Sequence, residues 1–272
     1  MASDHSQKFK PGNFKLADGT AGTVTGRGPP LVFLHGVGLD RRMWQAQVYF
    51  FARTNSVICY DLLGHGESAK LAGATDLKDF VAQLEGVWAA LGLDKAVLAG
   101  FSFGGLIALD FAIRRTSAIE RLVLIGTVYE RSEAERASVR QRLEKAKREG
   151  PQAIYPTALE RWFSPAFVAG QPEQIQELHH RMLGNDDASF LKAYEIFATG
   201  DRELEGKLGR IDCPTLIMAG ENDRGSTPAM AWRMAKEIPQ SRVSVIAGGR
   251  HMMPMETAQE VNREIARFMM AK

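Results

Sequence analysis

The stretch AVLAGFSFGGLIALDFA at residues 96–112 sets a serine among glycines and phenylalanines. The apolar run before it is typical of a buried strand, and the pattern after it has helical spacing. Ser102 therefore stands between a strand and a helix, within the motif Gly-x-Ser-x-Gly. This context predicts a nucleophile elbow, a sharp and strained turn that exposes the serine hydroxyl. Gly100 and Gly104 would pack against each other beneath the turn.

Short runs rich in Val, Ile and Leu recur along the chain and alternate with helical patterns. One helix is predicted over 76–91, where apolar residues follow a 3.6-residue spacing. Because continuous apolar strands belong to sheets covered on both faces, the chain is predicted to be α/β, with a doubly wound, mostly parallel sheet. Asp18 and Gly19 predict a hairpin that adds an antiparallel edge. The predicted strands lie at 30–36, 56–61, 96–100, 121–126, 214–220 and 241–249.

The alternation of strands and helices stops after Thr127 and resumes at Pro214. The interval has helical patterns broken by glycine and proline, and it is too long for a single crossover helix. We therefore predict a helical cap at 128–207, inserted into a core made by residues 1–127 and 208–272.

The composition of the 272-residue chain is that of a soluble globular protein, with 24% charged and 45% hydrophobic residues. The net charge of +2 is spread along the chain. The basic run at 136–148 also contains a glutamate and is predicted to be a solvated helix face. We therefore expect no nucleic-acid partner.

The first ten residues, MASDHSQKFK, are polar and lack the apolar centre of a signal peptide. No run approaches the ~20 apolar residues that cross a bilayer. We therefore expect a cytoplasmic protein without a membrane partner. Cys59 and Cys213 lie in strand-like runs and are expected to be buried thiols. The sequence carries no cofactor or metal motif that we recognise, so neither group is expected.

A nucleophilic serine needs a base, and the base needs a group that orients it. After a nucleophile elbow of this type, the acid and then the histidine follow later strands. Asp223 and His251 fit that order. We expect His251 to take the proton of Ser102 and Asp223 to hold the other ring nitrogen. The remaining histidines, which are placed less well for this role, are His5, His35, His65, His179 and His180.

An oxyanion hole is expected from two backbone N–H groups. That of Phe103 directly follows the nucleophile, and that of Val37 lies in the His-Gly-Val-Gly turn after a predicted strand. Each such donor stabilises the transition state by ~3 kcal/mol. His35 is expected to brace this turn rather than to act in catalysis.

The motifs FLHGVG, YDLLGHGES, GFSFGG and GENDR, together with His251 and Glu256, resemble the α/β-hydrolase superfamily. The resemblance spans nearly the whole chain. It implies the α/β-hydrolase fold, a small-molecule ester or lactone substrate, and a homodimer as one oligomeric option. A serine at position 102 separates the chain from the haloalkane dehalogenase and epoxide hydrolase branches, which carry an aspartate there.

Within the predicted cap, the segments ALERWFSPAF and AYEIFATGD are similar to 3-oxoadipate enol-lactonases. This resemblance implies a lactone or ester that bears a carboxylate. Trp162 would then line the acyl pocket, or alternatively pack the cap on the core. Arg161 would hold the carboxylate. A surface ion pair of Arg161 with Glu160 or Asp201 is the simpler interpretation.

Other side chains are expected near the reacting group because they flank the predicted catalytic residues. Gly36, Phe101 and Met252 are predicted to line the pocket, although core packing explains Phe101 and Met252 equally well. Arg250 precedes His251 and would add a positive charge beside the pocket.

The sequence thus predicts a serine hydrolase that cleaves a small ester or lactone through an acyl-enzyme on Ser102. Three alternatives share the fold. Carbon–carbon hydrolases of ring-cleavage products often have Gly-Pro-Gly in the oxyanion turn, which this chain lacks. Cofactor-free perhydrolases have the same triad. The third alternative, which is not primarily an enzyme, is a ligand-binding protein with slow turnover.

Overall fold

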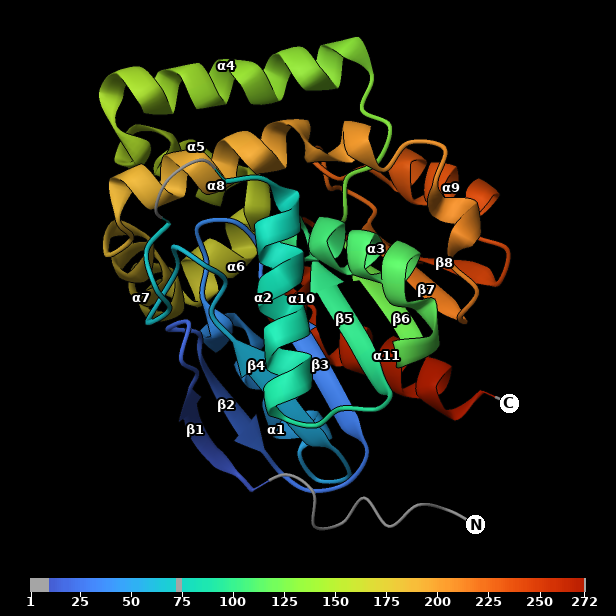
Figure 1. The fold of residues 1–272 in the computed structure, drawn as a ribbon. Coiled ribbons are helices and arrows are strands. Elements are labelled where there is room, and N and C mark those ends of the chain that lie inside the picture. Colours follow the sequence, from blue (N-terminus) through green and yellow to red (C-terminus); the bar gives the residue numbers. More distant parts are fainter. Residues whose placement is uncertain (1–9, 72–74, 272) are drawn as a thin grey trace, which may run out of the picture.

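The computed structural model describes residues 10–71 and 75–271 (Figure 1). His5 and most of the polar amino-terminal segment lie outside the described residues. An eight-stranded sheet forms the centre, in the order β1-β2-β4-β3-β5-β6-β7-β8. The strands are β1 (Gly12–Lys15), β2 (Ala21–Thr25), β3 (Pro30–Leu34), β4 (Ser56–Tyr60), β5 (Ala96–Phe101), β6 (Ile119–Ile125), β7 (Thr215–Gly220) and β8 (Ser241–Ile246).

The predicted sheet is confirmed. Strands β3 to β8 pair in parallel, and β2 pairs antiparallel with both β1 and β4. Each predicted strand forms within two residues of its expected start, and β3 to β7 are buried throughout or nearly so. The hairpin forms as well, with Asp18 accepting the Thr20 N–H at 2.8 Å and Gly19 in the left-handed region at φ +83°. Cys59 and Cys213 are buried free thiols, as predicted.

Helices cover both faces of the sheet (Figure 1). Helices α2 (Leu77–Ala90), α3 (Phe103–Arg115) and α9 (Pro228–Glu237) lie on one face, and α1 (Gln45–Phe51) and α11 (Ala258–Met270) lie on the other. The predicted helix at 76–91 is α2. It begins with a capping box between Asp76 and Asp79, and its apolar stripe is buried. The short α10 (Met253–Glu256) precedes α11.

In the described part of the chain, no strand interrupts the interval between β6 and β7. Its helices lie over the carboxyl ends of the parallel strands, with α4 and α8 running across the top in Figure 1. The assignment of 128–207 to a separate cap stays a prediction, and we use the name cap for this segment. Its helices are α4 (Glu133–Glu149), α5 (Tyr155–Trp162), α6 (Pro165–Gly170), α7 (Pro172–Leu183) and α8 (Asp187–Thr199).

The prediction that 136–148 is a solvated face is wrong at two positions. Arg136 is buried and lies within ion-pair distance of Asp201, which is fully buried, at 3.3 Å. Arg142 also turns inward and donates to Tyr194 Oη at 3.1 Å. The reason is that α4 packs on α8, so part of its basic run faces protein rather than water.

Candidate active site

Ser102 occupies the sharp turn between β5 and α3. Its backbone has φ 53° and ψ −111°, in the left-handed half of conformational space that a residue with a side chain rarely adopts. The turn requires glycine nearby, since a Cβ on Gly100 would lie 2.4 Å from the Gly104 carbonyl oxygen. This close approach holds Ser102 in its strained conformation at the carboxyl edge of the sheet.

The side chains of Ser102, His251 and Asp223 meet at this edge, although 149 residues separate the first two. His251 Nε2 lies 3.2 Å from Ser102 Oγ, and His251 Nδ1 lies 2.7 Å from Asp223 Oδ2. Asp223 Oδ1 accepts the backbone N–H groups of Gly225 and Ser226 at 2.8 and 3.0 Å. With the Asp223 carboxylate accepting from Nδ1–H, Nε2 has its lone pair free to accept the Ser102 proton.

The topology explains why these residues come together. Asp223 follows the end of β7, and His251 follows the end of β8. Parallel strands place their carboxyl ends at one edge, which is where ligands bind in open α/β sheets. The neighbouring aromatic rings pack against the base: those of Phe101 and Trp162 lie 4.8 and 6.1 Å from the His251 ring.

The Gly36–Gly38 turn passes beside Ser102. A Cβ added to Gly36 would lie 3.3 Å from Ser102 Cβ and 3.0 Å from the Phe101 ring, so a side chain here would press on both residues. Val37 is in the same turn, and Phe103 is the first residue of α3, where helix geometry leaves the N–H without an intrahelical partner. Phe103 is thus next to Ser102 in the chain, and the turn that carries Val37 lies beside Ser102 in space.

Two neutral histidines hold this turn. His35 Nε2 accepts the Leu62 N–H at 2.9 Å, so its Nδ1–H donates to the Gly36 carbonyl at 2.8 Å. His65 Nε2 accepts the Gly38 N–H at 2.9 Å. The expectation that His35 braces the turn is confirmed by these bonds. The same bonding explains why His65, which the sequence placed in a different loop, lies in the interior.

Acid is expected to destabilise the protein through these two rings. Burial lowers the pKa of His35 from 6.5 to about 4 and that of His65 from 6.5 to about 3. The unfolded chain takes up these protons near pH 6.5, whereas the folded chain does not. The stabilisation is therefore complete above pH 6.5 and is lost as the pH falls toward 3. His65→Gln removes one such group. Between pH 7 and pH 5, the free energy of unfolding of the variant should therefore fall by about 2 kcal/mol less than that of the wild type.

Urea unfolding at the two pH values measures this difference. His180→Gln is the matched control, because His180 is an exposed helix residue. Its loss between the two pH values should equal that of the wild type. The same loss in His65→Gln as in the wild type would contradict the assignment of a neutral buried ring.

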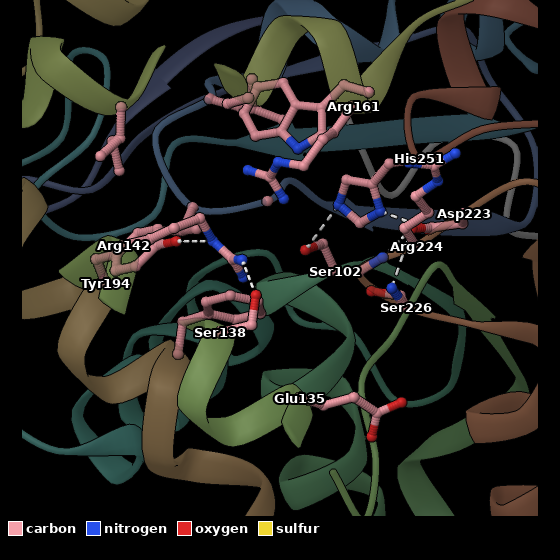
Figure 2. Close-up of a pocket in the computed structure, with 18 of the residues that line it drawn as sticks. Ser102, Glu135, Ser138, Arg142, Arg161, Tyr194, Asp223, Arg224, Ser226 and His251 are labelled. Atoms are coloured by element: carbon pink, nitrogen blue, oxygen red, sulfur yellow. Dashed lines mark hydrogen bonds and ion pairs between the residues drawn. The ribbon is translucent and has the colours of Figure 1, made fainter. Parts of the chain in front are cut away.

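A cavity of about 280 Å³ opens beside Ser102 between the sheet edge and the cap (Figure 2). Of the residues predicted to line the pocket, Gly36, Phe101, Arg161 and Trp162 do so, and Val37 lines it as well. Met252 does not, and this prediction was wrong. Met252 is fully buried in the hydrophobic core, with its N–H bonded to the Trp162 carbonyl at 3.0 Å.

Two further side chains near the site do not line the cavity. The Phe103 ring packs against Phe80 and Phe197 within the protein, so the residue brings only its backbone to the site. Arg250 does not line the cavity. Its guanidinium donates to the Glu160 and Phe163 carbonyls at 3.1 and 3.2 Å, so these bonds hold it against α5 and the residue that follows that helix.

Arg161 faces the cavity and makes no ion pair with a described residue. Its Nε donates to the Thr157 carbonyl, one turn back on α5, at 3.1 Å. The predicted surface pair with Glu160 or Asp201 is wrong, because Asp201 is fully buried and pairs with Arg131 at 2.7 Å. Burial, and then the positive charge of Arg142, lower the pKa of the Arg161 guanidinium.

Arg142 is a cavity residue that the sequence did not reveal. It donates from Nε to Tyr194 Oη at 3.1 Å and from Nη1 to Ser138 Oγ at 2.8 Å, both neutral partners. Figure 2 shows the Arg142 and Arg161 side chains pointing toward each other beside Ser102. The available signal was the stripe formed by Val139, Leu143 and Ala146, which marks the buried side of α4.

No group of three metal-ligating side chains occurs within residues 10–71 and 75–271. Over the same residues, no helix is long and apolar enough to cross a membrane.

Comparison with known proteins identifies the family. The model of the alpha/beta hydrolase family matches residues 31–264. A relative from Acinetobacter baylyi, (E)-2-((N-methylformamido)methylene)succinate hydrolase, is 34% identical over 240 residues, covering 88% of this chain and 89% of that protein. The 3-oxoadipate enol-lactonase 2 of the same organism is 28% identical and covers 89% of this chain and 88% of its own.

Solved structures agree in fold. An esterase from Thermogutta terrifontis, with malate bound, superposes with a TM-score of 0.83 at 29% identity, covering 96% of this chain and 98% of that one. The enol-lactonase from Burkholderia xenovorans has a TM-score of 0.85 at 24% identity, covering 93% and 96%, and shows the fold alone. The chain therefore belongs to the alpha/beta hydrolase family and is a hydrolase.

Proposed function

We propose that this hydrolase cleaves a small carboxylic ester or lactone that carries a carboxylate, through an acyl-enzyme on Ser102. The observation that carries the proposal is the pairing of two features in one cavity. Ser102, His251 and Asp223 form a hydrogen-bonded series, and the partly buried Arg142 and Arg161, neither with a carboxylate partner among the described residues, face it.

In the first half-reaction, Ser102 Oγ bonds to the substrate carbonyl carbon and its proton passes to His251 Nε2. The carbonyl oxygen becomes an oxyanion, which the N–H groups of Val37 and Phe103 stabilise. The bond to the leaving oxygen then breaks, and that oxygen receives the proton from His251. Asp223 keeps the imidazole oriented and stabilises its positive form.

In the second half-reaction, water takes the place of the leaving alcohol or enol. His251 removes a proton from the water as its oxygen bonds to the acyl carbon. A second oxyanion forms and collapses, the bond to Ser102 Oγ breaks, and the serine recovers its proton from His251. The products are the carboxylic acid and free enzyme.

The arginines support an anionic substrate. Arg131 pairs with Asp201, and Arg136 pairs with Asp201 and Glu205, whereas Arg142 and Arg161 bond only to neutral oxygens. Arg224 also lines the cavity but is exposed to water. Two unpaired guanidinium groups in one partly buried cavity repel each other, and a carboxylate between them would remove that cost. The esterase solved with malate bound binds a dicarboxylate on the same fold, which is consistent with this proposal.

A second candidate differs in the bond that is cleaved. The relative at 34% identity is named for a succinate that carries an N-methylformamido group, and hydrolysis at that group breaks a bond to nitrogen. Both candidates share a serine acyl-enzyme and an anionic substrate, so the same two arginines serve either one.

The test is a substrate panel with purified wild-type protein. The panel holds 3-oxoadipate enol-lactone, (E)-2-((N-methylformamido)methylene)succinate and p-nitrophenyl acetate. We expect kcat/KM for at least one of the two anionic substrates to exceed that for the neutral ester by about 100-fold or more. Preference for the neutral ester would overturn the carboxylate requirement. Binding of the anionic compounds without turnover of any substrate would favour a ligand-binding protein.

A further inference from the structure

The turn that carries the Val37 amide is held from two sides. On the core side, the Gly38 N–H donates to His65 Nε2 at 2.9 Å, and the Gly36 carbonyl accepts from His35 at 2.8 Å. On the cap side, the Gly38 carbonyl accepts the side-chain amide of Asn185 at 2.9 Å. Asn185 lies between α7 and α8, so one of the bonds that fix this turn comes from the cap.

Asn185 is also joined to the cavity wall. Its Nδ2 donates to the Met182 carbonyl at 3.1 Å, and Met182 lines the cavity. Tyr155 also lines the cavity and lies next to Asn185. Burial raises the pKa of Tyr155, and a side-chain hydrogen bond with Asn185 partly offsets that rise. The amide therefore connects the wall that contacts substrate with the backbone beside Ser102.

Other contacts bring the same part of the cap to the turn. We call residues 181–190 the α7–α8 elbow. Arg181 Nε lies 3.2 Å from Asp40 Oδ2, and the Phe190 ring packs so closely on Gly38 that an added Cβ would lie 2.8 Å from it. Gly38 has φ +76°, a conformation that glycine adopts freely and can also leave freely. The turn thus depends on its neighbours for rigidity.

We propose that Asn185 is a positioning residue that couples the cap to the oxyanion turn. The inference rests on the proposed function. Its amide holds the carbonyl of the Gly38–Leu39 peptide. The N–H of that peptide donates to the Gly36 carbonyl at 3.2 Å, which keeps the Gly36–Val37 peptide oriented with the Val37 N–H toward the reaction centre. An oxyanion donor acts only at about 2.7–3.1 Å, so a small rotation of this peptide weakens it. Because the oxyanion forms in the transition state, the loss falls on kcat rather than on KM.

The test compares Asn185→Asp and Asn185→Ala with the wild type on p-nitrophenyl acetate. Aspartate keeps the size of the side chain but cannot donate to the Gly38 carbonyl. We expect kcat to fall about tenfold or more in both variants, with KM within about twofold. A trifluoromethyl ketone, whose adduct with Ser102 carries an oxyanion, should lose affinity by the same factor as kcat. Asn185→Gln retains a donor and should recover part of kcat.

The matched control is Lys70→Ala. It removes an exposed ion pair, in which Lys70 lies 2.6 Å from Asp186 of the α7–α8 elbow. The bond from Asn185 to Gly38 stays in place. Wild-type kcat is expected. Unchanged kcat in the Asn185 variants, or an equal fall in Lys70→Ala, would overturn the proposal. Failure of the proposed function looks different, because the wild type itself would then lack Ser102-dependent turnover.

Discussion

The Ser102→Ala variant is expected to hydrolyse p-nitrophenyl acetate at least about 10⁴-fold more slowly than the wild type. Without the hydroxyl, His251 Nε2 loses the partner that lies 3.2 Å away, and no acyl-enzyme can form. The remaining rate reflects only substrate binding and the oxyanion amides. The variant should fold normally, because removing Oγ leaves the strained backbone turn occupied by a smaller side chain.

Initial rates and mass spectrometry of acid-quenched protein measure this effect. The wild type should show an acyl adduct on the peptide that contains Ser102, and the variant should show none. Ser244→Ala is the control. The Ser244 hydroxyl donates to Glu264 of α11, and Ser244 does not line the cavity beside Ser102. A variant at Ser102 that retains turnover would rule out the acyl-enzyme and leave direct attack by water.

Arg142 and Arg161 have no carboxylate partner among the described residues, and removing their guanidinium groups is expected to reduce the preference for anionic substrates strongly. Arg142→Met and Arg161→Met should each lower kcat/KM for the best carboxylate-bearing substrate by about 10- to 100-fold, since each removes a charge-assisted hydrogen bond in a partly buried site. The rate on p-nitrophenyl acetate should stay within about threefold. Arg161→Lys keeps the charge but loses the forked geometry, so its loss should be intermediate.

The specificity ratio between anionic and neutral substrates is the quantity to measure. Arg140→Met is the matched control on the same helix: Arg140 is exposed and pairs with Glu133 rather than facing the cavity. Its ratio should equal that of the wild type. If Arg142→Met or Arg161→Met slowed both substrate classes equally, these arginines would be packing residues and the carboxylate assignment would fail.

The strands and the elbow were predictable because their signals are local. The central strands β3, β4, β5 and β7 are short, mostly apolar runs, and the nucleophile elbow is a serine between glycines whose neighbours are a strand and a helix. The meeting of Ser102 with Asp223 and His251 followed from chain order, because a parallel sheet brings the carboxyl ends of its strands to one edge.

The cap side chains were not predictable in the same way. The inward turn of Arg136 depends on Asp201, 65 residues further on, and that of Arg142 depends on Tyr194 in another helix. The prediction that Met252 lines the pocket was wrong because being next to His251 in the chain does not decide the direction of the Met252 side chain. A long charged side chain on an amphipathic helix is compatible with solvent or with a cavity, and only the packing partner selects one.

The sheet, the strained turn at Ser102 and the meeting of Asp223 with His251 could be derived from the sequence, since they arise from residues adjacent in the chain and from the geometry of parallel strands. The charge of the cavity and the bond from Asn185 to the Gly38 carbonyl could be learned only from the packed structure. Those features are contacts between the cap and the core, and their geometry depends on how separate helices pack against one another.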